Sequence, residues 1–365
     1  MRLLYLYPEE WTGRRAREVH TLSTCVALAR NGVEVALVTA GGLAEAQRQL
    51  REMAGTVNLP GLQIVALSRT FGPIRSAAIF KRRFHQWQRR QPRFDWAYII
   101  HLKAASMLVS EHVMPYAYEA HEIFAQTQQK SSAQEIALHE LERQVLSGAT
   151  LRVATSAPLA AALSTWFAAP NDFLIAPNAG QPPLPHGVSS PRGPFVYAGS
   201  IADWKGLDKI ILASRDAQVP LKIIGGTAGE WQELGRQLDT GGIEWQARVS
   251  LGDLPQALAG ARAGLVSTDP NTPSGKYSCP MKLFDYARCG LPVITTALLS
   301  LQSLETGSWC VQVTEPTREG WASALRDFAY HASEAESARA WSGAHTWANR
   351  ADFLVRALAG RNLRR

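Results

Sequence analysis

Apolar runs alternate with amphipathic segments along most of this chain of 365 residues. The short apolar runs are typical of buried strands, and the segments between them have the 3.6-residue period of helices. The runs fall at 2–7, 33–39, 95–100, 115–121, 151–156 and 172–178, and then at 195–200, 221–226, 264–269 and 292–296. Strands that alternate with helices predict parallel sheets, and therefore an α/β fold.

One segment interrupts this alternation. Residues 180–194, GQPPLPHGVSSPRGP, are rich in proline and glycine, and the strand–helix pattern restarts directly after them. This composition is typical of a linker. Two βαβ series joined by one linker predict two Rossmann-like domains with parallel sheets that face a cleft.

The stretch SCPMKLFDYARCGLPVI, residues 278–294, carries charged residues on an otherwise apolar helix between two strand-like runs. Pro280 is suited to the first helical turn and Gly290 to the C-terminal stop. Lys282 and Asp285 are three residues apart, so they share a face close to a helix N-terminus that favours anions. Open α/β sheets bind ligands at this kind of position.

Composition indicates a globular protein of the cytoplasm. Hydrophobic residues make up 46% of the chain, and the four cysteines show no C-x-x-C spacing. This argues against a zinc site or a disulfide framework and fits a reducing compartment. No apolar run approaches the roughly 20 residues that span a bilayer, and MRLLYLYPEE turns acidic too early for a signal peptide.

The net charge of +7 is unevenly distributed. No acidic residue lies between Met53 and Phe94, whereas residues 69–93 contain eight basic ones: Arg69, Arg75, Lys81, Arg82, Arg83, Arg89, Arg90 and Arg93. An apolar stripe at helical spacing runs among them: Ala77, Phe80, Phe84 and Trp87. Either this helix docks its stripe on its own domain, or the segment attaches to the inner face of an anionic membrane in a salt-sensitive manner. Nucleic acid is not expected, because no recognised binding motif accompanies the charge.

Lys205 follows a strand end and precedes a helix, and Gly206 beside it permits close backbone approach. A lysine in this position is a point charge suited to a diphosphate whose negative charge grows as a sugar leaves. The chain contains no D-x-D sequence that could clamp a metal–diphosphate complex. We therefore expect no metal requirement and no cofactor.

Seven segments resemble family 4 glycosyltransferases of GT-B fold, and they occur in the family's order. They are YPEEWTGRRAREVHTLSTCVALARNGVEVALVT, YEAHE, LERQVLSGATLRVATSAPLAAAL, IAPNAG, YAGSIADWKGLDKII, CPMKLFDYARCGLPVI and TWANRADFLVRAL. The resemblance implies an acceptor-binding domain at 1–182 and a nucleotide-sugar-binding domain at 183–340. It also implies that a final helix within 341–365 crosses back onto the first domain.

The resemblance also implies roles for individual residues. Lys205 and His121 would be catalytic, and Asp285 would hold the ribose of the donor. The donor would further contact Gly13, Ser200, Gly225, Gly226, Tyr277, Pro280, Met281 and Lys282, and the acceptor Arg14, Arg15, His121 and Glu122. The chain departs from the family at three positions, since it has Asp285 for a glutamate, Tyr277 for an acid and Ser200 for an arginine.

The function that follows is a retaining transfer of sugar from a nucleotide diphosphate sugar to the hydroxyl of a glycan or lipid-linked acceptor, within glycan or glycolipid biosynthesis. Tyr277 and Ser200 keep a second hypothesis open, in which a non-catalytic GT-B protein binds a sugar nucleotide or glycan as a scaffold or regulator. A dinucleotide-dependent oxidoreductase is a distant third, because no G-x-G-x-x-G follows a strand.

Overall fold

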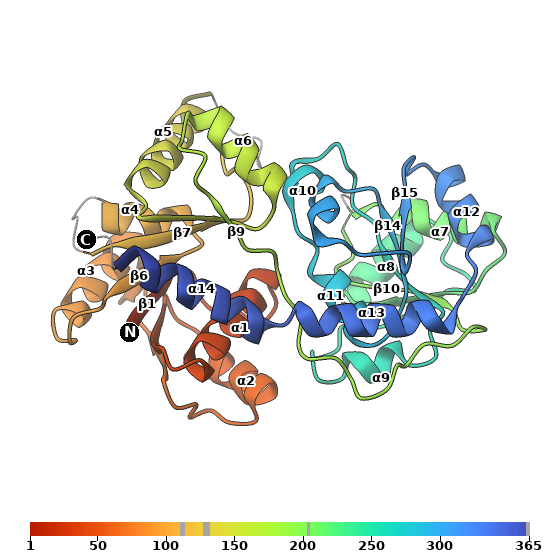
Figure 1. Ribbon diagram of the computed structural model, residues 1–365, viewed down its shortest axis with the longest axis horizontal. Coiled ribbons are helices and arrows are strands. Elements are labelled where there is room, and N and C mark those ends of the chain that lie inside the picture. The colour runs from red at the N-terminus through yellow and green to blue at the C-terminus, as the bar shows by residue number, and fades with distance from the viewer. Residues whose placement is uncertain (110–113, 127–131, 203–204, 363–365) are drawn as a thin grey trace. The chain divides into compact units, whose positions relative to one another are not determined.

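The computed structural model describes residues 1–109, 114–126, 132–202 and 205–362 (Figure 1). The chain forms two compact units. Residues 1–177 and the C-terminal helix make the first unit, and Asn178–Thr346 make the second. Each unit has its own parallel sheet with helices packed on it, which is the α/β architecture that the sequence predicts.

The first unit is built on a seven-stranded parallel sheet of order β3-β2-β1-β6-β7-β8-β9. Its strands are β1 Arg2–Tyr7, β2 Glu34–Thr39, β3 Leu62–Ala66, β6 Trp96–Ile99, β7 Tyr116–Ala120, β8 Leu151–Ala154 and β9 Leu174–Ile175. The helices are α1 Ala16–Arg30, α2 Leu43–Ala54, α3 Ala77–Gln88, α4 Leu102–Val109, α5 Ser132–Gly148, α6 Ala157–Phe167 and α14 Trp347–Asn362. A small hairpin, β4 Thr70–Phe71 and β5 Ile74–Arg75, precedes α3.

The second unit has a six-stranded parallel sheet of order β12-β11-β10-β13-β14-β15. Its strands are β10 Phe195–Ala198, β11 Leu221–Ile224, β12 Glu244–Gln246, β13 Ala263–Val266, β14 Val293–Thr296 and β15 Cys310–Val313. The helices are α7 Leu207–Asp216, α8 Ala228–Gln237, α9 Leu254–Leu258, α10 Pro273–Tyr277, α11 Met281–Arg288, α12 Arg318–Asp327 and α13 Ala332–Ala344, and a 3₁₀ helix covers Leu299–Leu304.

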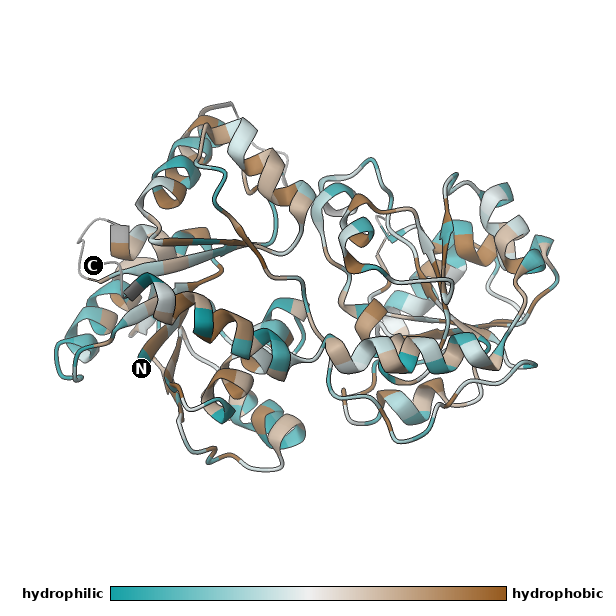
Figure 2. Cartoon of the chain, in the orientation of Figure 1, coloured by the Kyte–Doolittle hydropathy of each residue, from teal (hydrophilic) through white to brown (hydrophobic). Residues whose placement is uncertain are grey.

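The apolar runs of the sequence coincide with the central strands of both sheets, which Figure 2 shows in brown. Apart from the small hairpin β4–β5, the described strands that the sequence did not indicate are β3, β12 and β15, and all three lie at edges of the parallel sheets. An edge strand is covered less completely than a central one, so it lacks the continuous apolar run of a buried strand. In β15, for example, the two middle residues are exposed.

The boundaries between the two units differ by a few residues from the predicted domain boundaries. The units divide at 177/178 and 346/347, whereas the sequence placed the boundaries at 182/183 and 340/341. The predicted linker 180–194 belongs to the second unit, because its backbone is hydrogen-bonded there: Leu184 and Val188 donate to Arg288 and Cys289. Helix α14 packs against α1 of the first unit.

Helix α3 shows which way the apolar stripe of the basic segment points. Phe80 and Phe84 are buried, and the ring of Trp87 lies 6.0 Å from that of Phe94. Ala77, at the start of the stripe, is exposed. The aromatic part of the stripe therefore docks on its own domain. Among the described helices, none combines the length and apolar character needed to cross a bilayer.

Candidate active site

Each sheet has a topological switch point. There, the connections that follow two neighbouring strands lead to opposite sides of the sheet's strand order. In the first sheet the switch lies between β1 and β6, and in the second between β10 and β13. Loops at the carboxyl ends of such strands diverge and leave a crevice, which is the usual ligand position in open α/β sheets. Of the residues singled out by sequence, Ser200 and Lys205 follow β10, Gly225 and Gly226 follow the neighbouring strand β11, and His121 follows β7.

Close backbone approach shapes the crevice of the second unit. Gly225, with φ +137°, follows β11, and a Cβ there would lie 1.8 Å from the carbonyl oxygen of Gly199, which follows β10. A Cβ on Gly199 would lie 2.2 Å from Lys282 Nζ. Gly226 has φ +69° and touches Ile201. Only glycine fits such positions, so the loops after β10 and β11 meet closely beside Lys282.

Two lysines share this crevice. Lys282 Nζ lies 3.9 Å from the centre of the Tyr197 ring, and the backbone carbonyl of Lys205 accepts a hydrogen bond from Ser267, just after β13. Burial lowers the pKa of Lys205 to about 8. Burial, followed by the charge of Lys205, lowers the pKa of Lys282 well below its usual value. Without a ligand, each positive charge disfavours protonation of the other lysine. A ligand with more than one negative charge would stabilise both protonated lysines.

Asp285 lies one helical turn after Lys282 on α11. Burial raises the pKa of its carboxyl to about 6, although Arg288 and Lys282 oppose the rise. The carboxylate is therefore short of hydrogen-bond donors in this crevice, which is the environment in which hydroxyl groups of a ligand would stabilise it.

Helix α11 is held firmly, so its first turn is a fixed platform. The hydroxyl of Tyr286 accepts a hydrogen bond of 2.7 Å from the backbone N–H of Ala198 on β10. Asn178 Nδ2 donates to the carbonyl of Cys279 at 2.5 Å. Pro280 is the N-cap residue of α11, one position earlier than the first-turn placement predicted from sequence, and Met281 is its first residue.

The remaining donor candidates also lie near strand ends. Ser200 follows β10, and its carbonyl accepts a hydrogen bond of 2.9 Å from the Tyr197 hydroxyl. Tyr277 is the last residue of α10 and is partly exposed. Both belong to the second unit, which thus contains every predicted donor residue except Gly13.

In the first unit an acid and a histidine bridge the switch point. Glu9 follows β1 and His101 follows β6, and Glu9 Oε1 lies 3.0 Å from His101 Nε2. Arg15 Nη1 reaches the other oxygen of Glu9 at 2.5 Å. The hydrogen bond from His101 lowers the pKa of Glu9 to about 2. Arg15, a predicted acceptor ligand, is therefore already engaged with an ionised carboxylate.

The glycine loop of the first unit is closed by an acid of its own helix. Gly13 has φ +71°, as its predicted role requires. The buried carboxylate of Glu18, however, accepts backbone N–H groups from Thr12 at 2.8 Å, Arg14 at 2.9 Å and Arg15 at 3.1 Å. These three donors already have a partner. The predicted donor contact at Gly13 therefore cannot use these three N–H groups while Glu18 holds them.

His121 lies at the edge of a buried charged cluster. Glu119, on β7, has no exposed surface, and its Oε1 lies 2.9 Å from Nε2 of His121 and 3.1 Å from Nε2 of His20. Arg350 of α14 donates to the same oxygen at 2.6 Å, and the Tyr98 hydroxyl bonds the other. Although burial opposes it, the charge of Arg350 helps hold the pKa of Glu119 well below its usual value.

The neighbouring groups complete the picture of this cluster. Burial lowers the pKa of His20 to about 4, so this ring is neutral at pH 7. One quarter of the His121 side chain is exposed, so this ring can reach a ligand while its other edge faces Glu119. Glu122 forms an ion pair with Arg17 at 3.2 Å, and Arg14 is exposed.

The cluster was also tested as a metal site. His20, Glu119 and His121 bring their possible ligand atoms within 4.8 Å of one another. Arg350 already binds the carboxylate oxygen that faces both rings. A cation there would meet a guanidinium at contact distance, so these residues do not fit a metal ion.

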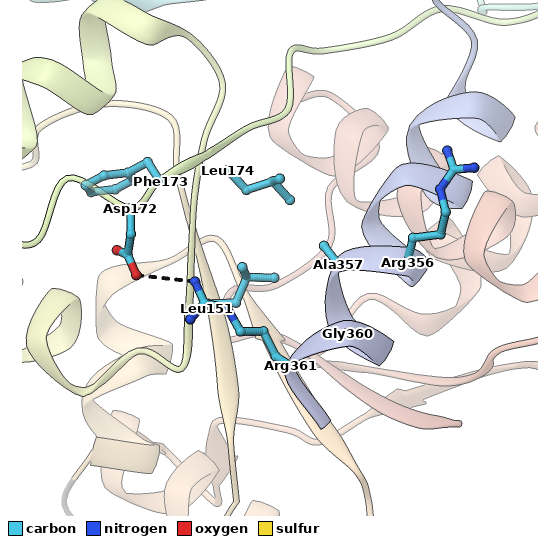
Figure 3. A pocket seen from close by; sticks show the side chains of 8 residues that line it. All are labelled: Leu151, Asp172, Phe173, Leu174, Arg356, Ala357, Gly360 and Arg361. Atoms are coloured by element: carbon cyan, nitrogen blue, oxygen red, sulfur yellow. Dashed lines mark hydrogen bonds and ion pairs between the residues drawn. The ribbon is translucent and has the colours of Figure 1, made fainter. Parts of the chain in front are cut away.

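A separate cavity of about 350 Å³ lies between β8, β9 and α14 (Figure 3). Figure 3 shows Asp172 at one wall, joined to Arg361 by an ion pair of 3.3 Å. Leu151, in its lining, is the first residue of β8. The cavity thus opens at the amino ends of the strands, at the edge opposite His121, and we do not assign it to the active site.

Sequence reasoning missed Glu9, His101, Glu18 and Arg350. For Glu9 and His101 a signal existed, because each comes directly after an apolar run, where parallel strands gather their functional residues. Arg350 gave no signal, since its partner Glu119 is 231 positions away.

Two family models match the chain. A glycosyl transferase 4-like domain matches residues 4–179, and a glycosyl transferase-like domain matches residues 207–356. The chain therefore belongs to the glycosyltransferases, and it is an enzyme of that class with the GT-B fold. No curated protein matches the chain at a significant level.

Solved structures agree with this assignment. HepE from Anabaena, in complex with UDP-glucose, is 14% identical with a TM-score of 0.72, over 99% of this chain and 100% of that one. Sucrose-phosphate synthase from Thermosynechococcus elongatus is 14% identical with a TM-score of 0.74, over 100% of both chains. WaaG, a glycosyltransferase involved in lipopolysaccharide biosynthesis, is 15% identical with a TM-score of 0.66, over 98% of this chain and 100% of that one. At these identities the likeness concerns the fold.

Proposed function

We propose that this glycosyltransferase transfers a sugar from a nucleotide diphosphate sugar to an acceptor hydroxyl with retention of the anomeric configuration. The observation that carries the proposal is the switch point of the second unit, where Lys205 and Lys282 are both partly buried with lowered pKa values and Asp285 follows one turn after Lys282. The UDP-glucose bound in the solved structure of HepE supports a donor of this class. Retention rests on the resemblance to family 4.

Each group has a role in this proposal. Lys205 and Lys282 hold the diphosphate, with Pro280 and Met281 at the helix start beside it, and Lys205 stabilises the charge that develops as the sugar leaves. Asp285 accepts hydrogen bonds from the ribose hydroxyls. Gly199, Gly225 and Gly226 let the loops after β10 and β11 meet closely, which holds their backbone beside Lys282. Tyr277 and Ser200 take the positions at which the family has charged groups, and both offer hydroxyls for neutral hydrogen bonds.

For the first unit we propose acceptor binding. His121 can donate to or accept from a sugar hydroxyl, while Glu119 holds the opposite edge of its ring. Arg14 is exposed beside Gly13, where its guanidinium suits an acidic or phosphorylated acceptor. Arg15 and Glu122 are engaged in ion pairs with Glu9 and Arg17. In this proposal they position these partners around the acceptor. An acceptor that is a glycan or a lipid-linked sugar is consistent with these groups.

The proposed activity is tested by incubating the pure protein with a panel of sugar nucleotides and measuring release of nucleoside diphosphate. Turnover of one donor, even slow hydrolysis without an acceptor, supports the proposal. Binding without turnover of any donor, with or without candidate acceptors, would instead favour a scaffold. The anomeric configuration of the product, measured by NMR coupling constants, tests retention.

We expect this activity to persist when divalent metals are removed. Two lysines and a helix N-terminus already neutralise the diphosphate, and the chain has no D-x-D sequence. The measurement compares donor turnover in excess EDTA with turnover in Mg²⁺ or Mn²⁺. A loss of about tenfold or more in EDTA that Mg²⁺ restores would show that a metal is needed.

Donor affinity should be greatest between about pH 6 and pH 8. Asp285, with a pKa of about 6, must be ionised to accept both ribose hydroxyls, so affinity falls as the pH drops through that value. Lys205, with a pKa of about 8, must be protonated to bind the diphosphate, so affinity falls as the pH rises through that value. Calorimetric titration with an intact sugar nucleotide measures this, because its two diester phosphates keep a constant charge. Asp285→Asn should abolish only the acidic limb.

A further inference from the structure

We propose that the β4–β5 hairpin and the basic face of α3 dock onto an anionic lipid bilayer, with the hairpin tip entering the headgroup layer. This inference is independent of the proposed donor chemistry. The expectation drawn from sequence set two alternatives against each other, docking of the aromatic stripe on its own domain and attachment of the segment 69–93 to an anionic membrane. The structure buries Phe80 and Phe84 of that stripe, so the apolar contact must come from elsewhere.

The hairpin provides an apolar contact of its own. Phe71 is 70% exposed and Ile74 60% exposed, the two highest values among large hydrophobic residues before α3. They are directly paired across the antiparallel strands, so their side chains are neighbours on one face. Gly72, with φ +56°, and Pro73 form the tight turn that presents them. Exposure of a neighbouring phenylalanine and isoleucine to water is unfavourable. Their transfer to a lipid interface is therefore favourable.

A basic hollow lies beside the hairpin. It measures about 460 Å³ and is lined by α3 and by the chain that follows β3: Ala66, Leu67, Ser68, Arg83, Gln86, Trp87 and Arg90. Arg83 Nη1 donates to the Ser68 carbonyl at 2.9 Å, which fixes that guanidinium, while Arg90 is exposed. Two arginines with an indole between them suit a phosphate headgroup whose attached chain is apolar.

The charge around this surface fits a membrane in particular. Arg82, Arg89 and Arg93 are exposed on or just after α3, the helix that carries teal residues in Figure 2. No acidic residue falls between Met53 and Phe94. Glu10, from outside this range, pairs with Arg75 of the hairpin at 2.9 Å, so the exposed arginines on and after α3 supply the positive field. Each basic side chain near an anionic leaflet adds electrostatic attraction. The apolar hairpin tip adds hydrophobic burial in the lipid layer, which a nucleic acid does not offer.

The experiment is vesicle flotation of the full chain with phosphatidylcholine vesicles, with and without phosphatidylglycerol. We expect binding only when phosphatidylglycerol is present, and release at high salt, where the screening length shrinks from about 10 Å to about 3 Å. Joint Phe71→Ser and Ile74→Ser should lower the partition coefficient about tenfold to a hundredfold. Joint Arg89→Glu and Arg90→Glu, both exposed, should lower it at least about twentyfold.

A matched control uses an exposed apolar residue outside the hairpin. Ile136, on α5, is 70% exposed, and Ile136→Ser should leave vesicle binding unchanged. Unaltered circular dichroism spectra and melting temperatures establish that the variants fold. Wild-type protein that does not float with phosphatidylglycerol vesicles overturns the proposal. Binding that survives loss of Phe71 and Ile74 overturns the role of the hairpin, and retention on nucleic acid without vesicle binding assigns the charge to another partner.

Discussion

Lys205→Ala should lower the turnover number by about 10²–10³-fold, with a smaller effect on the Michaelis constant of the donor. This is the loss typical of removing a group that stabilises charge formed in the transition state. Lys205 is partly buried, its charge acts on Lys282, and its pKa of about 8 leaves it mostly protonated near neutral pH. Steady-state release of nucleoside diphosphate over a range of donor concentrations separates the two constants.

Asp285→Ala should show the opposite pattern. The ribose changes little during transfer, so loss of its charge-assisted hydrogen bonds should weaken donor binding by about tenfold to a hundredfold, equivalent to about 1.5–3 kcal/mol, with turnover less affected. Asp285→Glu restores the residue that the family usually carries and should bind the donor nearly normally. The matched control for Lys205→Ala is Lys222→Ala, which removes a lysine of β11 that pairs with Glu244 at 2.8 Å.

Two results would contradict this placement of the donor. One is unchanged turnover in Lys205→Ala together with unchanged donor binding in Asp285→Ala. The other is an equal loss in Lys222→Ala, which would show that only net positive charge matters.

Arg350→Met should lower the free energy of unfolding of the first unit by about 3–5 kcal/mol. The substitution leaves Glu119, which has no exposed surface, as a buried carboxylate without its strongest partner. It also removes the bonds from Arg350 to the carbonyls of Ala176 and Pro177, where the chain leaves the unit. Urea unfolding followed by fluorescence and circular dichroism measures the change.

Two further variants separate the buried charge from other effects. Arg356, on the same helix, pairs with Asp352 at 2.9 Å, and its side chain is 71% exposed. Arg356→Met should therefore cost no more than about 0.5 kcal/mol, the usual value of an exposed helical pair. Glu119→Gln combined with Arg350→Met should be less harmful than Arg350→Met alone, because no unpaired charge remains. Equal losses in Arg350→Met and Arg356→Met would mean that the buried ion pair contributes nothing.

How much could be predicted from the sequence differs between the two units. In the second unit, Lys282 and Asp285 lie on one short helix and Lys205 in one strand-end loop, so local spacing was enough to select them. In the first unit, His121 could be selected from its place after β7, but not the groups that surround it. Its partners His20, Tyr98 and Arg350 come from α1, β6 and α14.

The basic segment shows a different limit. Its helix, its stripe and its lack of acids could all be read from residues 69–93. Periodicity identifies an apolar face, but it does not say whether the protein's own sheet or a lipid surface covers that face. The structure places Phe84 in the core and leaves Phe71 and Ile74 exposed.

The sequence by itself determined the α/β class, the division into two Rossmann-like units and the central strands, and it selected Lys205, Lys282 and Asp285 as candidate donor ligands. These depend on periods of two to four residues, on prolines and glycines, and on strand ends, all of which are local. Only the tertiary structure decided that Glu18 closes the Gly13 loop and that Arg350 meets Glu119. A buried charge gains its partner from whichever element packs against it, and that choice is made by the fold of the whole chain.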